Sequence, residues 1–151
     1  MQRRKGMRAV AGLIAAILVA ALLMLPAGAL ASAFFKGPVN GGANNAGVEF
    51  RAKIRHDHPR KVLEFRWFNI PVPPRCADSF EGLQFSMTVN HRGKFHGTFS
   101  HAGHKATVHG KFKDHAKKAA GTLELSGDFI GGCPNADTGP LPWTATRAGT
   151  G

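Results

Sequence analysis

The sequence has no tyrosine and only two tryptophans, two cysteines and nine acidic residues among its 151 residues. It also lacks the G-x-S-x-G, H-E-x-x-H, S-x-x-K and phosphate-loop motifs of common enzymes. No motif in the sequence therefore supports hydrolysis or nucleotide binding. A hydrolase whose site is assembled from loops is kept as an alternative. Because Trp67 and Trp143 fall at core positions of strand patterns, an exposed aromatic surface for stacking sugars is also disfavoured.

Negative charge is scarce, since 20 Lys and Arg face 9 Asp and Glu, a formal net charge of +11. Four of the basic residues precede the one long apolar run, residues 9–25, and small residues follow it as far as Ala33. A basic start, an apolar middle and a small-residue exit are the layout of a secretory signal. We expect residues 1–33 to be a signal peptide cleaved after Ala33. An uncleaved membrane anchor at residues 9–25 is the alternative, and both place the domain outside the cytoplasm.

The two cysteines, Cys76 and Cys133, both follow this segment. Thiols of an exported protein meet an oxidising environment, so a disulfide between them is expected. Closing so long a loop stabilises the folded state by about 4 kcal/mol in the chain-entropy model. A metal pair and a catalytic thiol are the competing interpretations, and the absence of a C-x-x-C spacing counts against zinc.

The rest of the chain is dominated by alternation of apolar and polar residues, which is typical of strands with one solvated face. Residues 34–47 are rich in Gly and Asn and are predicted to be a leader, and residues 148–151 a tail. Between residues 113 and 120 we expect a turn with one helical loop. The domain at 48–147 is predicted to be all-β, an antiparallel β-sandwich or a closely related barrel of about seven strands. The predicted strands are 48–54, 62–70, 80–89, 95–99, 106–112, 122–126 and 143–146.

The order of several short motifs resembles a group of small exported proteins common in actinobacteria. The motifs are Cys76 ahead of Phe85-Met87-Val89, then Gly93-Lys94-Phe95, Gly110-Lys111-Phe112, Ala120-Gly121-Thr122-Leu123, Cys133, and Gly139-Pro140-Leu141-Pro142-Trp143-Thr144-Ala145. The similarity covers roughly residues 45–147. It implies the β fold and the location outside the cytoplasm. The group has no assigned activity, so the resemblance implies no mechanism.

Histidine is concentrated in one stretch, because six of the eight lie between His91 and His115. If Ser100 to Lys105 form a hairpin turn, a register in which paired positions sum to 205 sets Lys94 opposite Lys111 and His96 opposite His109. A second hairpin with positions summing to 233 places Glu124 beside His109. Opposed side chains lie about 5 Å apart at Cβ. We therefore predict a basic ligand-binding face made of Lys94, His96, His109 and Lys111.

Two other interpretations of the histidines stay open. His96, His109 and Glu124 are a weak candidate for a transition-metal site, because the neighbouring lysines repel a cation, and the whole row is otherwise a solvated sheet face. His56-Asp57-His58 is either a charged turn or a chelating pair, and Pro59 favours the turn. His101, His104 and His115 are predicted to lie exposed in turns.

Without residues 1–33, the chain keeps 16 Lys and Arg against 9 Asp and Glu, a net +7. A polyanionic partner fits this charge. We expect an acidic glycan, a teichoic-type polymer or a phospholipid headgroup rather than nucleic acid, since the domain is exported. The sequence thus favours a secreted, non-enzymatic binding module with no cofactor. The alternatives are the loop-built hydrolase and a membrane-tethered form of the same domain.

Overall fold

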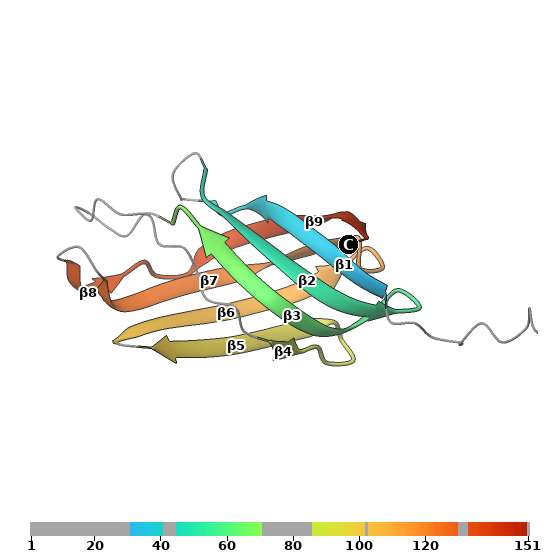
Figure 1. Ribbon diagram of the computed structural model, residues 1–151, viewed down its shortest axis with the longest axis horizontal. Coiled ribbons are helices and arrows are strands. Elements are labelled where there is room, and N and C mark those ends of the chain that lie inside the picture. The colour runs from blue at the N-terminus through green and yellow to red at the C-terminus, as the bar shows by residue number, and fades with distance from the viewer. Residues whose placement is uncertain (1–30, 41–44, 71–85, 102, 130–132, 151) are drawn as a thin grey trace, which may run out of the picture.

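The computed structural model describes residues 31–40, 45–70, 86–101, 103–129 and 133–150, and its regular elements there are all β-strands (Figure 1). This confirms the predicted all-β, antiparallel architecture. Within these ranges no helix is long and apolar enough to cross a membrane. The strands are β1 (Ala31–Pro38), β2 (Gly47–Arg55), β3 (His58–Phe68), β4 (Met87–Thr88), β5 (Lys94–His101), β6 (His104–Lys113), β7 (Lys118–Phe129), β8 (Cys133–Asp137) and β9 (Leu141–Thr150).

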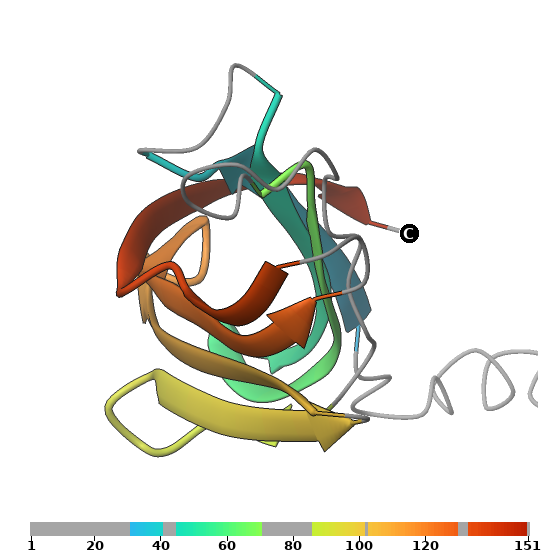
Figure 2. The ribbon, with the colours of Figure 1, turned by 90° about the vertical axis from the view of Figure 1, so that its left-hand side faces the viewer.

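The sheet curls into a barrel that is nearly closed. Its order is β4-β3-β2-β1-β9-β7-β6-β5, so most neighbours in the sheet are also neighbours along the chain, and β1 pairs with β9. The two ends of this order meet where Val89 bridges Phe95 and where Asn90 N donates to Lys94 O at 2.9 Å. Figure 2, turned by 90° from Figure 1, shows the strands wrapping round a common centre. Such closure removes most exposed strand edges.

Strands β8 and β9 act as one interrupted strand along β7. Asp137 pairs with Ser126 at the end of β8, and Leu141 pairs with Leu123 at the start of β9. Between them Thr138 N donates to Leu125 O, and Leu125 N donates to Thr138 Oγ1, both at 2.9 Å. The threonine hydroxyl therefore replaces a backbone carbonyl at the interruption. Counted this way, eight strand positions surround the barrel.

The predicted alternation explains which side chains enter the barrel. In β2 the odd-numbered Glu49, Arg51 and Lys53 face outward, whereas their even-numbered neighbours are buried. Trp67 and Trp143, each 1% exposed, belong to the core as expected. The largest fully buried side chains are Trp67, Trp143, Phe35, Phe50, Phe65, Ile70, Leu123, Leu125, Val48, Val62 and Val108.

Aromatic rings fill the middle of the barrel around Phe50. Its ring stacks on Phe35 with centroids 4.8 Å apart and planes 4° apart. Four further rings have centroids within 6.0 Å of Phe50, namely those of Phe65, Phe95, Phe112 and Trp143. An eight-stranded barrel has an interior just wide enough for side chains to fill. This interior is a packed core, and the two pockets described below lie on the outer surface.

The predicted leader at 34–47 is wrong for its first part. Residues Ala31–Pro38 form β1, between β2 and β9, and Ala33 and Phe35 are both 0% exposed. Residues of β1 also alternate between buried and outward positions. In the sequence, the apolar segment before them and the Gly and Asn residues after them obscure this pattern. Cleavage after Ala33 would remove three residues of a barrel strand. Residues 9–25, 41–44 and 80–85 lie outside the described residues.

Candidate basic binding pocket

The predicted basic face lies on the outside of β5, β6 and β7. The pairing of β5 with β6 has the predicted register: Lys94 opposes Lys111 and His96 opposes His109. Phe95 and Val108 point into the barrel and are buried, so the side chains of even-numbered β5 residues and odd-numbered β6 residues point outward. Alternation and the tight hairpin closed by the His101–His104 pair together place all four basic residues on one surface.

The next pairing differs from the prediction by two residues. In the register of β6 with β7, His109 opposes Thr122 and Glu124 opposes Thr107, so paired positions sum to 231 and not to 233. The cause is the turn at residues 114–117, which is closed by the Lys113–Lys118 pair. Asp114, His115 and Ala116 all have positive φ angles, between 51° and 57°. This tight left-handed turn replaces the helical loop that we expected.

The shifted register weakens the candidate metal site. Glu124 is one pair away from the His96–His109–Thr122 row, and it therefore does not complete a row with the two histidines. The described residues contain no group of three or more His, Cys, Asp or Glu side chains placed to hold a metal ion. The imidazole rings of His96 and His109 stack, with centroids 6.1 Å apart and planes 17° apart. They form a pair of imidazoles beside two lysines.

These four side chains border a surface pocket of about 460 Å³. Lys94 and His96 come from β5, and His109 and Lys111 from β6. Strand β7 contributes small residues to the wall: Ala120, Gly121 and Thr122. Among the described residues lining it there is no carboxylate. Its volume lies within the usual range of small-ligand sites, roughly 300–1,000 Å³.

Two features of the chain hold this pocket in place. Asn90 Oδ1 accepts hydrogen bonds from Arg92 N at 2.9 Å and from Lys94 N at 3.0 Å, which fixes the backbone where β5 begins. Gly110 and Gly121 are paired behind the pocket, and a Cβ on Gly121 would overlap the His109 carbonyl. A glycine at 121 therefore allows β6 and β7 to approach closely.

The electrostatic character of the pocket follows from its two unpaired lysines. Lys94, Lys111, His96 and His109 are exposed. Among the described residues, the ion pairs that we find join Lys36 with Glu49 and Lys118 with Asp114, and neither involves the pocket. The two pocket lysines oppose each other directly and repel. An anion placed between them relieves this repulsion.

The remaining predicted histidines do not join this pocket. His56 and Asp57 form the exposed turn between β2 and β3, with φ angles of 48° and 60°, and His58 begins β3. His101 ends β5 and His104 begins β6, so they are paired strand residues and not turn residues; His104 is half-buried. His115 is exposed in a turn, as predicted.

The predicted disulfide between Cys76 and Cys133 falls outside what the structure describes. Cys76 is not among the described residues, and no side-chain position is described for Cys133, so the predicted disulfide is not addressed.

Asn90, Ala120 and Thr122 line the basic pocket and were missed by the sequence analysis. The β6–β7 register would have identified the two β7 residues, because they oppose Lys111 and His109.

Comparison with known proteins gives no assignment. No protein-family model, curated protein or solved structure matches the chain. Function therefore has to be inferred from the chemistry of its own surface.

Proposed function

We propose that this protein is an exported or cell-surface binding module that holds an anionic ligand in the pocket between β5, β6 and β7. The observation that carries the proposal is the pocket itself: Lys94, His96, His109 and Lys111 converge on one volume of about 460 Å³. Convergence distinguishes a binding site from a generally basic surface, which by itself favours only solubility and non-specific association.

The chemistry of the lining favours phosphate or carboxylate groups. Two ammonium groups and two imidazoles donate hydrogen bonds to anionic oxygens, and the Thr122 hydroxyl adds a neutral donor. Acidic glycans, teichoic-type polymers and phospholipid headgroups all present such groups outside the cytoplasm. We propose binding without catalysis, because the described lining offers donors to anionic oxygens and no catalytic motif in the sequence accompanies its two histidines.

The surrounding surface supports a polymeric ligand. The outward positions of β6 also carry Lys105 and Lys113, and β7 carries Lys118, which is paired with Asp114, and the acid Glu124. A negatively charged chain passing over the pocket would meet further cations on either side. Attraction of this kind acts over roughly 8–10 Å at moderate ionic strength.

The test compares two charge-reversal variants of equal net charge. Lys94→Glu/Lys111→Glu alters the pocket, and Lys53→Glu/Lys61→Glu alters another directly opposed lysine pair, on β2 and β3. Each is titrated calorimetrically with polyphosphate and with polygalacturonate at low and high salt. We expect the pocket variant to bind at least about tenfold more weakly, which is about 1.4 kcal/mol, and the control variant to stay near the parent.

Two results would contradict the proposal. Equal losses in the two variants would mean that only net charge matters. Binding that is unchanged by salt, or by the pocket substitutions, would mean that the lysines do not hold the ligand. Turnover of a polymer that requires residues of another surface would favour the alternative of a loop-built hydrolase.

A further inference from the structure

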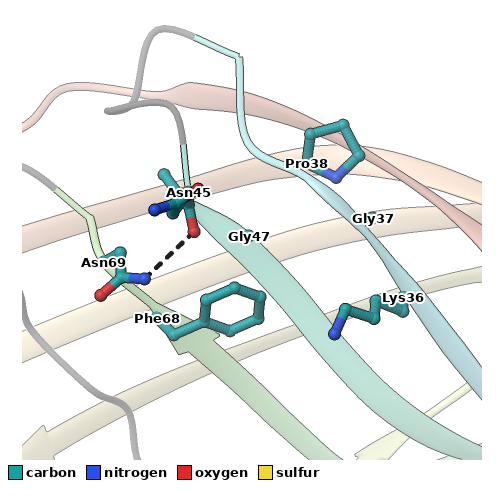
Figure 3. A pocket seen from close by; sticks show the side chains of 8 residues that line it. Lys36, Gly37, Pro38, Asn45, Gly47, Phe68 and Asn69 are labelled. Carbon is teal, nitrogen blue, oxygen red and sulfur yellow. Dashed lines mark hydrogen bonds between the residues drawn. The ribbon is translucent and has the colours of Figure 1, made fainter.

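A second pocket, of about 430 Å³, lies on a different part of the barrel, on the outside of β1, β2 and β3 (Figure 3). It is found where β1 ends, β2 begins and β3 ends. Its lining includes Lys36, Asn45, Gly47, Phe68 and Asn69. None of these residues belongs to the basic pocket, so the two surfaces can be altered separately.

Phe68 gives this pocket an aromatic wall. Trp67 points into the barrel, and the next residue, Phe68, therefore points outward and is half-buried. Gly47 pairs with Phe68, and a Cβ on Gly47 would overlap the end of the ring, with Cε2 only 2.9 Å away. The missing side chain at position 47 allows the ring to lie across the neighbouring strand. The ring is thus held in place as part of the outer surface.

Polar groups surround the ring in a fixed arrangement. Lys36 Nζ lies 2.9 Å from Glu49 Oε1 and 5.7 Å from the centre of the Phe68 ring. On another side, Asn69 Nδ2 donates a hydrogen bond to Asn45 O at 3.2 Å (Figure 3). The Asn69 amide has a second hydrogen to donate, and the Glu49 carboxylate has a second oxygen to accept.

The charges of this pocket balance, in contrast to those of the basic pocket. Lys36 is the charged residue of the described lining, and the Glu49 carboxylate beside the pocket neutralises it, so the site offers donors and acceptors without net charge. A flat apolar ring bordered by such groups matches a pyranose, which has a face of C–H bonds and a rim of hydroxyl groups. We propose that this pocket binds a neutral sugar ring, stacked on Phe68 and hydrogen-bonded at its edge by Asn69 and the Lys36–Glu49 pair.

The proposal is independent of the anion site and gives the protein a second ligand class. The chain has no tyrosine and both tryptophans are buried, so neither residue type offers a surface for stacking a sugar. Phe68 is the aromatic residue that faces outward here, and in the sequence it follows Glu64 and Arg66 on the solvated side of the strand pattern.

Saturation-transfer NMR on the intact protein tests the proposal with glucose, galactose, mannose, N-acetylglucosamine, cellobiose and maltose as probes. We expect transfer to at least one probe, mainly to the C–H protons of one ring face. Phe68→Leu should weaken that binding at least about fivefold, the value of one lost aromatic contact of about 1 kcal/mol. Phe34→Leu is the matched control, because Phe34 is a half-buried, outward aromatic of β1 outside the pocket.

Glu49→Gln provides a second variant that does not depend on packing of the ring. It removes a carboxylate acceptor from the surface and should also weaken binding of the same probe. Absence of transfer to all six probes would overturn the proposal, as would equal binding by the Phe68 and Phe34 variants. Loss of anion binding in the basic-pocket variant would leave this test unaffected.

Discussion

Gly110 and Phe95 form a cross-strand pair on which the fold behind the basic pocket depends. The Phe95 ring covers Gly110, and a Cβ at position 110 would overlap the ring: even the third-nearest ring atom would be 2.8 Å away. Real Cβ atoms rarely approach so closely, so Gly110→Ala must displace the ring or the strand. Phe95 is only 2% exposed and contacts Phe112 and Trp143, which leaves it little room.

The expected cost can be estimated from two opposing effects. Overpacking a core by one methyl group costs about 1–3 kcal/mol. Replacing a strand glycine by alanine returns about 0.5–1 kcal/mol, because alanine loses less backbone entropy on folding. Taking the middle of both ranges, we expect Gly110→Ala to lower the free energy of unfolding by about 1 kcal/mol. For a domain of this size that lowers Tm by roughly 5 °C.

Thermal and urea unfolding followed by circular dichroism measures this change. The double variant Phe95→Leu/Gly110→Ala is the control, because leucine lacks the far edge of the ring that meets the new methyl group. The two substitutions should therefore be non-additive by about 1 kcal/mol, with Gly110→Ala costing less beside Leu than beside Phe. An unchanged or raised stability of Gly110→Ala, or strictly additive costs, would refute the proposed contact.

Three further predictions concern separate features. His115→Gly should raise the free energy of unfolding by about 1 kcal/mol in urea titrations, because His115 has a φ of 53°, a left-handed conformation that costs residues other than glycine about 1–2 kcal/mol; a loss of stability would contradict the strain. The double variant His96→Ala/His109→Ala should bind polyphosphate about two- to fivefold more weakly than the parent in calorimetric titrations, because it removes two hydrogen-bonding side chains that border the pocket; unchanged binding would exclude the histidines from the site. If the predicted signal peptide is removed on export, intact mass should show cleavage before Ala31, since residues 31–33 belong to β1; a chain starting at residue 34 would contradict this.

The alternation of apolar and polar residues predicted the fold class and the β5 and β6 side of the basic pocket for a simple physical reason. The strands of the β5–β6 hairpin are joined by a short turn, and any register that keeps Phe95 and Val108 inside also keeps the lysines and histidines outside. A slip of one residue would bury charged groups. Burial and turn length therefore fix this part of the surface together.

The missed features arise where burial does not choose between alternatives. A two-residue shift of β7 keeps its apolar residues inside, so alternation could not decide between the predicted and observed partners of His109. The left-handed turn at residues 114–117 sets the register between β6 and β7, and its sequence has no glycine or asparagine to indicate such a turn. Strand β1 was missed because an alternating segment next to a long apolar run loses its periodic signal.

Backbone amide shifts in ¹H–¹⁵N NMR spectra during titration with tripolyphosphate test the central claim most directly, since they locate the bound anion. The account predicts that the largest shifts fall in three short stretches, residues 94–96, 109–111 and 120–122, and that they shrink as salt is added. Shifts of equal size around the opposed lysines Lys53 and Lys61, or no localised shifts at all, would contradict it.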